Sequence, residues 1–342
     1  MKRLLSLLAA LLLLLSGCTA AVNGPKQEKF TATFLDVFDT VTTIVGMAPD
    51  KATFEQSARA VHEQLKEYHQ LFDIYNTYEG VTNLKSVNDQ AGVAPVQVDG
   101  RILQLLLDCK AFYRATNGRV NVAMGSVLAL WHEKRSEALD DPRIAALPDP
   151  AALAEAAKHC DMDKVILDQQ AGTVYLADPE MRLDVGAVAK GWAVEQVAKT
   201  AAKGLLISVG GNVCATSPKD ENGTPWVVGI QDPKGGDQYL HTVYVSGGSV
   251  VTSGDYQRLF VVDGTPYHHI IDPDTLYPSE YWRSVTIICP DSGVADALST
   301  ALFVLPLEQG QQLLEQYGAE ALWVDREGKL YYSPGFQKMI RT

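Results

Sequence analysis

The stretch "VADALSTALFVL" (residues 294–305) places three oxygen-bearing side chains at helical spacing. Asp296, Ser299 and Thr300 stand at positions i, i+3 and i+4, so a helix would gather their oxygens on one face. A carboxylate beside hydroxyl groups is a set of hard oxygen ligands, which suits Mg²⁺. The alternative is helix capping, in which such side chains bond only to backbone N–H groups, and spacing alone favours capping.

The stretch "RLDVGAVAKGWA" (residues 182–193) puts two opposite charges into a crowded, glycine-rich turn. We expect Asp184 to end a strand and a helix to begin between Gly186 and Gly191. Free N–H groups at a helix start favour an anion, small side chains let a ligand approach, and Lys190 adds a charge suited to phosphate. Together with a metal site, this indicates a pyrophosphate ligand. The alternative is a structural ion pair between Asp184 and Lys190.

The dipeptide His268-His269, directly before "IIDP", supplies a candidate proton carrier. Adjacent side chains of a strand point to opposite faces, so only one of the two can face a site. Imidazole titrates in the range that proton transfer needs. His62, His69 and His132 fall on or beside predicted helices, and we expect them to be surface or packing residues.

Helices come first and hairpin-like strands later, which indicates an α+β domain with a largely antiparallel sheet flanked by helices. A strand or hairpin is predicted over 29–47 and a helix from 49 to 72, followed by a loop rich in Asn, Gly and Asp. Residues 252–255, "TSGD", are typical of a β-turn. Further helices are expected over 102–115 and near 150–158, 186–202 and 294–304, with strands dominating from residue 163 onward.

Composition and charge limit the classes of protein. The 342 residues are 46% hydrophobic and 20% charged, enough for one large domain or two modest ones. A formal net charge of −12 makes the chain a poor nucleic-acid binder. No GxGxxG or P-loop motif occurs. Cys109 and Cys289 lie in apolar segments and are expected to be buried thiols.

The N-terminus has the pattern of an export signal. A basic start, Lys2 and Arg3, precedes an apolar run to Leu15 that is too short to span a bilayer, so residues 1–17 are predicted to be a signal peptide. "LSGC" resembles a bacterial lipobox, in which Cys18 is lipidated, and residues 18–29 would be the tether. The alternative is an ordinary secretory signal with a chance cysteine.

A set of ordered stretches from about residue 35 to 335 resembles the ApbE family of FAD:protein FMN transferases. They are "FDTVTTI", "LFDIYNTY…NLKSVN", "GRVNVAMGSVLALW", "RLDVGAVAKGWA", "SVGGN", "TSGDYQRLF", "HHIIDP" and "ADALSTALFVL". The resemblance implies an ApbE-like (T-fold-like) domain over 30–342. It also implies Mg²⁺-dependent attack of a Thr or Ser hydroxyl of an acceptor protein on FAD, the substrate, with release of AMP.

The resemblance further implies roles for individual residues. Asp296 and Thr300 match the side-chain Mg²⁺ ligands, Ser299 lies close to them, and Ala187 matches a position that would supply its carbonyl oxygen. His269 is the candidate for activating the acceptor hydroxyl. The positions that match FAD contacts are Phe38, Tyr75, Asn121, Val122, Ala123, Asp184, Lys190 and Ile270.

This sequence departs from the family pattern on the FAD side. Asn121 and Ala123 stand where aspartate and threonine are usual, and Phe38-Asp39 stands where Met-Gly is frequent. Two alternatives to flavin transfer stay open: FAD hydrolysis to FMN and AMP, and a non-catalytic flavin-binding lipoprotein. The expected partners are acceptor proteins, either a membrane redox complex or an extracellular electron carrier. The expected location is the extracytoplasmic side of the cell membrane, held by the lipid anchor.

Overall fold

The structure is a computed structural model, and it describes residues 27–236 and 238–342. The predicted signal peptide (1–17) and the lipidated Cys18 lie outside the described residues and stay predictions. The first strand, β1 (Glu28–Val37), includes the last two residues of the predicted tether, Glu28 and Lys29. Within the described part, no helix combines the length and the apolar character that crossing a bilayer requires.

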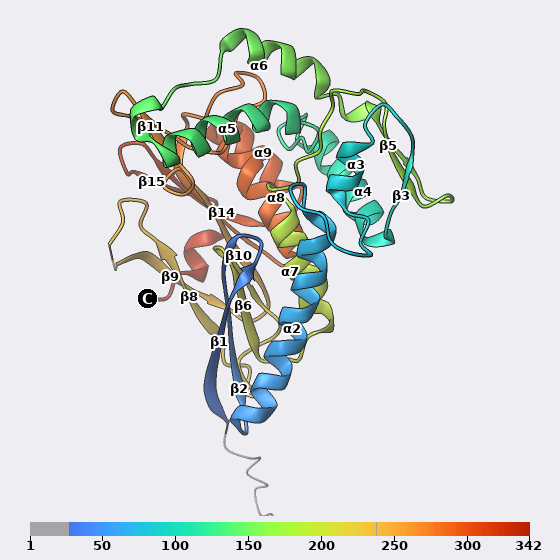
Figure 1. Ribbon diagram of the computed structural model, residues 1–342. Coiled ribbons are helices and arrows are strands. Elements are labelled where there is room, and N and C mark those ends of the chain that lie inside the picture. Colours follow the sequence, from blue (N-terminus) through green and yellow to red (C-terminus); the bar gives the residue numbers. More distant parts are fainter. Residues whose placement is uncertain (1–26, 237) are drawn as a thin grey trace, which may run out of the picture.

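An eight-stranded sheet forms the centre of the molecule (Figure 1). All its neighbouring strands are antiparallel, which confirms the predicted α+β class. In spatial order its strands are β1, β2 (Thr40–Ala48), β6 (Leu205–Val209), β7 (Asn212–Ala215), β10 (Gly248–Gly254), β13 (Trp282–Cys289), β14 (Glu320–Asp325) and β15 (Leu330–Tyr332). Burial alternates along β6, where Leu205, Ile207 and Val209 are buried and the two residues between them are half-buried.

Three helices, α2 (Lys51–Phe72), α7 (Ala189–Thr200) and α8 (Ser292–Phe303), pack on one face of this sheet and on one another. Figure 1 shows α2 running along the β1–β2 hairpin. The predicted period of α2 is confirmed, because Phe54, Ala58, Val61 and Leu65 are all buried. Asp50 caps this helix by accepting the Thr53 N–H at 2.8 Å. This layer therefore provides the rigid base for any site at its end.

The other elements cover the remaining surfaces. β8 (Trp226–Gln231) and β9 (Tyr239–Val245) form a hairpin whose apolar residues join a second core cluster with Val250 and Phe336. A three-stranded sheet has the order β3 (Val96–Gln97), β5 (Thr173–Leu176) and β4 (Val165–Asp168). A two-stranded sheet pairs β11 (Phe260–Val262) with β12 (Thr265–Tyr267). The remaining α-helices are α3 (Leu84–Asp89), α4 (Gly100–Ala115), α5 (Gly125–Asp140), α6 (Pro150–Ala156) and α9 (Leu307–Glu315).

Several local predictions are wrong. Residues 252–254 belong to β10 rather than to a turn, because they continue the antiparallel pairing of this strand with β13. The loop after α2 contains the short helix α3, which starts from a capping box between Asn83 and Ser86. Residues 182–184 form no named strand, and His268 and His269 follow β12 instead of lying in it.

The β1–β2 turn is strained, and this strain gives a stability prediction. Phe38 and Asp39 both adopt left-handed backbone conformations, with φ of 55° and 50°. We expect Asp39→Gly to raise the free energy of unfolding by about 0.5–1 kcal/mol, because glycine adopts this conformation without a steric cost. Urea denaturation checks the change. Asp39→Ala is the control, since it keeps the Cβ and should give no gain.

Candidate active-site cleft

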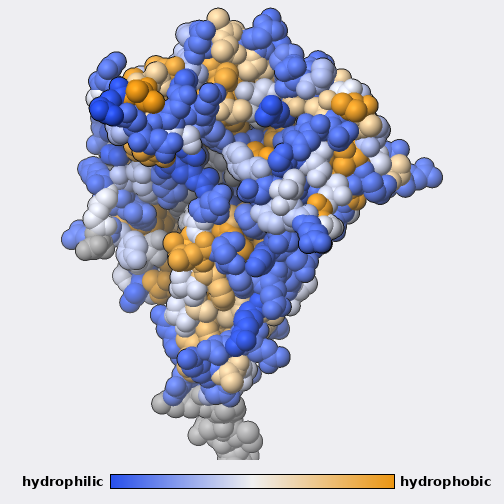
Figure 2. All heavy atoms as spheres, viewed as in Figure 1, coloured by the Kyte–Doolittle hydropathy of each residue, from blue (hydrophilic) through white to orange (hydrophobic). Residues whose placement is uncertain are grey.

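A cleft with a volume of about 300 Å³ lies at the end of the helical layer. Figure 2 shows a recess in this face of the molecule, between the upper helical part and the lower part of the sheet. Segments far apart in sequence meet there: the β1–β2 turn, residues 184–190, β10 and α8. The predicted site residues that line it are Phe38, Tyr75, Asn121, Asp184, Ala187, Lys190, His269, Ile270, Asp296 and Thr300.

Three predicted residues do not line this cleft. Val122 and Ala123 are buried behind it, where the Val122 carbonyl accepts the Asp184 N–H at 2.8 Å. The Ala123 N–H donates to the Asn121 side chain at 2.9 Å. The Ser299 hydroxyl is buried, donates to the Asp296 carbonyl at 2.8 Å and lies 2.8 Å from the hydroxyl of Ser253, which does line the cleft. Val122 and Ala123 therefore support the cleft wall, and a metal-ligand role for Ser299 stays a prediction.

Asp296 is a buried carboxylate, 4% exposed, in the second turn of α8. It does not cap its own helix, because Asp291 does so by accepting the Val294 N–H at 2.9 Å. Its Oδ2 instead accepts the Gly191 N–H at 2.8 Å, in the first turn of α7. Burial raises the pKa of Asp296, and the Lys190 ammonium and the Gly191 N–H oppose that rise. This carboxylate therefore requires positive charge beside it to stay ionised.

Lys190 supplies part of that charge. Its Nζ lies 3.6 Å from Asp296 Oδ2 and donates to the Gly186 carbonyl at 3.3 Å. The alternative of an ion pair with Asp184 is not what the structure shows, since Asp184 Oδ1 accepts the Gly186 N–H at 2.9 Å instead. The two charges of the turn thus have separate tasks: Asp184 shapes the turn, and Lys190 faces the carboxylate of α8.

The oxygen ligands that these residues offer fit Mg²⁺ only when a substrate supplies further ligands. Residues 27–236 and 238–342 hold no cluster of three or more His, Cys, Asp or Glu side chains that could bind a metal. The positions predicted to bind the metal instead offer the Asp296 carboxylate, the Thr300 hydroxyl and the backbone at Ala187, all in the cleft lining. Mg²⁺ is usually held by one or two carboxylates together with waters and substrate phosphates, so this sparse set is suitable when a phosphate-bearing ligand is present.

Gly191 gives a second stability prediction. A Cβ at this position would overlap the Asp296 side chain and the Ser292 carbonyl. We therefore expect Gly191→Ala to lower the free energy of unfolding by about 1–3 kcal/mol, because the close packing of α7 on α8 must open. Gly100→Ala in α4 is the control, since a Cβ there meets nothing within 4 Å. Equal thermal unfolding of the two variants would contradict the close approach.

His269 has the geometry of a proton acceptor. Its Nδ1 lies 3.2 Å from the Gln257 carbonyl, which can only accept, so Nδ1 carries the proton and Nε2 keeps its lone pair. Burial, assisted by the nearby Arg258, lowers the pKa of His269 to about 3, so the ring is neutral at pH 7. His268 is buried outside the cleft and bonds the Ser279 carbonyl at 2.9 Å. Only one of the paired histidines therefore faces the site.

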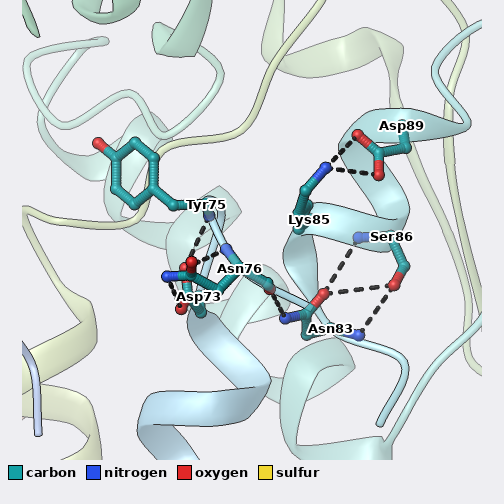
Figure 3. Close-up of polar contacts among 7 residues, drawn as sticks. All are labelled: Asp73, Tyr75, Asn76, Asn83, Lys85, Ser86 and Asp89. Atoms are coloured by element: carbon teal, nitrogen blue, oxygen red, sulfur yellow. Dashed lines mark hydrogen bonds and ion pairs between the residues drawn. The ribbon is translucent and has the colours of Figure 1, made fainter. Parts of the chain in front are cut away.

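Tyr75 presents an aromatic ring at the cleft, positioned from behind by Asp73. Asp73 Oδ1 accepts the N–H groups of Tyr75 and Asn76, at 2.6 and 3.1 Å. Figure 3 shows the Tyr75 ring projecting away from this cluster. Burial raises the pKa of Tyr75, so its hydroxyl keeps its proton, and this hydroxyl forms a hydrogen bond with His132 Nδ1 at 2.7 Å. The ring is thereby held at both ends.

Several cleft residues were not predicted to be there. His69 and His132 line the cleft, which the sequence did not predict, although His69 also packs edge-on against Phe38 as expected of a packing residue. His69 Nδ1 accepts the Phe38 N–H at 3.2 Å and so fixes the strained turn. His62, in contrast, stacks on Phe34, which confirms its packing role. The other unpredicted lining residues that carry polar groups include Asp39, Arg119, Asn212, Gln257 and Arg258.

Comparison with known proteins identifies relatives of this chain. The model of the ApbE family matches residues 38–323. The FAD:protein FMN transferase of Treponema pallidum is 36% identical over 313 residues, 84% of each chain, and that of Klebsiella pneumoniae is 32% identical over 272 residues, 77% of this chain and 79% of the other.

Solved structures agree with this assignment. The ApbE protein of Thermotoga maritima is 30% identical with a TM-score of 0.81, covering 92% of this chain and 100% of its own. The flavin transferase ApbE of Vibrio cholerae shares the fold, with a TM-score of 0.74 at 22% identity over 92% of this chain and 99% of its own. The ordered motifs, the antiparallel fold and these similarities show that this chain belongs to the ApbE family.

Proposed function

We propose that this chain is an FAD:protein FMN transferase, which uses Mg²⁺ to transfer the FMN part of FAD to a Thr or Ser hydroxyl of an acceptor protein. The observation that carries the proposal is the meeting of Asp296 and Thr300 with Ala187, Lys190 and His269 in one cleft. Relatives over most of the chain length are FAD:protein FMN transferases, which supports the same activity here.

The reaction is a phosphoryl transfer, in which one P–O bond forms and one P–O bond breaks. The acceptor hydroxyl oxygen forms a bond to the FMN phosphorus, and the bond from that phosphorus to the bridging oxygen breaks. The bridging oxygen leaves with AMP, and the hydroxyl proton moves to Nε2 of His269. Such reactions depend on alignment and on neutralisation of charge, so the side chains that fix the diphosphate matter most.

The residues of the cleft divide these tasks between them. Asp296, Thr300 and the Ala187 carbonyl would hold Mg²⁺, which supplies charge neutralisation on the diphosphate when bound. Lys190 and Arg258 add fixed positive charge from the cleft wall. Phe38 and Tyr75 offer aromatic faces to the flavin or adenine ring.

The location and partners of the protein belong to the same proposal. A lipid on Cys18 would hold the folded domain at the extracytoplasmic side of the cell membrane, with the "LSGC" sequence as its support. The acceptor would then be a membrane redox complex or an extracellular electron carrier. Cys18→Ser should move the protein from the membrane fraction to the soluble fraction of cells.

Co-expression with acceptor proteins tests the activity. We expect mass spectrometry to find FMN on a Thr or Ser of one acceptor, and we expect AMP to form in equal amount. Free FMN without protein-bound flavin would instead identify an FAD hydrolase. Bound but unconsumed FAD, with Mg²⁺ present, would identify a flavin-binding protein without turnover.

A further inference from the structure

A chain of hydrogen bonds runs from the strained β1–β2 turn to the end of α2. The backbone N–H of Phe38 donates to Nδ1 of His69 at 3.2 Å, and Nε2 of His69 lies 3.3 Å from the hydroxyl oxygen of Tyr78. The Tyr78 hydroxyl donates to Oδ2 of Asp73 at 2.7 Å. We call the side chains of His69, Tyr78 and Asp73 the relay. They connect the turn, the last turn of α2 and the loop that follows this helix.

The chemistry of its donors and acceptors sets the direction of the relay. A backbone N–H can only donate, so Nδ1 of His69 accepts and Nε2 carries the proton of the ring. Burial and the neighbouring Asp73 raise the pKa of Tyr78 to about 12, so its hydroxyl keeps its proton and donates it to Asp73. The Tyr78 oxygen is then the acceptor for Nε2 of His69. All three hydrogen bonds therefore point from the turn to the carboxylate.

Asp73 ends the relay as an ionised carboxylate. It is the C-cap residue of α2, where the helix dipole disfavours a negative charge, so hydrogen-bond donors must stabilise it. Figure 3 shows it accepting the N–H groups of Tyr75 and Asn76 and the amide of the Asn76 side chain. Burial raises the pKa of Asp73, but these bonds and the one from Tyr78 outweigh burial and lower it. One carboxylate therefore holds both the relay and the Tyr75 backbone.

Each end of the relay positions an aromatic residue of the cleft. Phe38 and Tyr75 both line the cleft, and the proposed function assigns both of them to the rings of FAD. The backbone of Phe38 is left-handed, with φ of 55°, and its hydrogen bond to His69 offsets part of the cost of this conformation. Tyr78 is not among the described residues that line the cleft. It can therefore influence a ligand there only through its neighbours.

We propose that the relay of His69, Tyr78 and Asp73 is a positioning device for FAD, which holds the Phe38 turn and the Tyr75 loop in one arrangement so that both aromatic side chains meet the dinucleotide. This inference rests on the proposed FMN transferase activity. The relay leaves the predicted metal ligands and His269 in place, so its loss should weaken FAD binding far more than it slows turnover.

Tyr78→Phe tests the relay, because it removes the hydroxyl and keeps the ring. We expect the Kd for FAD to rise about fivefold, as for the loss of one hydrogen bond, and kcat for flavinylation to change less than about twofold. Flavin fluorescence measures the Kd, with EDTA present so that FAD is not consumed. Tyr331→Phe is the matched control, since it removes a hydroxyl that donates to Asp325 at 3.1 Å, outside the described cleft lining. It should leave the Kd unchanged.

A double-mutant cycle with Asp39→Gly separates positioning from a general loss of stability. Asp39 has φ of 50°, which glycine adopts without strain, so the turn of the glycine variant should depend less on His69. We expect Tyr78→Phe to raise the Kd less than about twofold when it is compared with Asp39→Gly alone. A merely structural role of Tyr78 would lower the thermal midpoint without this dependence of the Kd on residue 39.

Three results would overturn the inference while flavin transfer by the wild type still stood. They are an unchanged Kd in Tyr78→Phe, an equal rise of the Kd in Tyr331→Phe, and a rise that persists in full in the Asp39→Gly background. A loss of kcat in Tyr78→Phe that exceeds its loss of affinity would also contradict a positioning role in binding. Absence of FAD binding by the wild type would instead refute the proposed function, and the inference with it.

Discussion

Asp296→Ala should abolish Mg²⁺-dependent flavin transfer while FAD still binds. We expect kcat to fall about 10³-fold, equivalent to about 4 kcal/mol of lost stabilisation of the transition state. FAD affinity should fall less than about tenfold, because Lys190, Arg258 and the aromatic residues of the cleft remain in place. The measurement is initial rates of protein flavinylation over a Mg²⁺ titration, after the metal has been removed with EDTA.

Two controls separate metal binding from folding. Asp296→Asn keeps an oxygen that can accept the Gly191 N–H, so it should fold like the wild type and still lose the response to Mg²⁺. Asp291→Ala removes the cap of the same helix and should cost about 1 kcal/mol of stability with kcat unchanged. Wild-type turnover in Asp296→Ala would refute the assignment of this carboxylate to the metal.

The sequence predicts most reliably what depends on local spacing. The helical period placed Asp296 and Thr300 on one face of α8, and both line the cleft. The same reasoning located α2, the antiparallel strands and the turn that carries Lys190. Family motifs then extended the prediction to Phe38 and Tyr75, for which spacing offers no signal.

The predictions that were wrong concern features that depend on contacts between distant segments of the chain. β10 is rich in Gly and Ser, and it is a strand because β7 and β13 pair with both its edges. Lys190 faces Asp296 rather than Asp184 because α7 packs on α8, a contact between segments about a hundred residues apart. His132 of α5 meets Tyr75 at the cleft, a contact between residues 57 positions apart in the sequence. A local sequence pattern contains no information about which distant segment a residue will contact.

His269→Ala tests the proposed base. Loss of a general base typically reduces rates by about 10²–10⁴-fold, so we expect kcat for flavinylation to fall within this range with little change in FAD affinity. Added imidazole should restore part of the rate, because the vacated space lies within the cleft. If His269 had only a structural role, added imidazole would not raise the rate of the His269→Ala variant.

The pH profile provides an independent readout on the same residue. Because the pKa of His269 is lowered to about 3, the free enzyme keeps the ring neutral and able to accept a proton throughout pH 5–8. Bound diphosphate adds negative charge, which favours the protonated ring and raises this pKa. We therefore expect the acid limb of kcat to lie at higher pH than that of kcat/KM for FAD.

The neighbouring histidine supplies the control for both measurements. His268→Gln loses buried contacts with Ser279 and Ile270, so it should lower the thermal midpoint and leave kcat of the folded protein within about threefold of wild type. If His268→Gln instead removed activity, and His269→Ala kept wild-type kcat, the proton would have to pass elsewhere. Ser253 and Thr252 of β10 also line the cleft and would be the next hydroxyl groups to test.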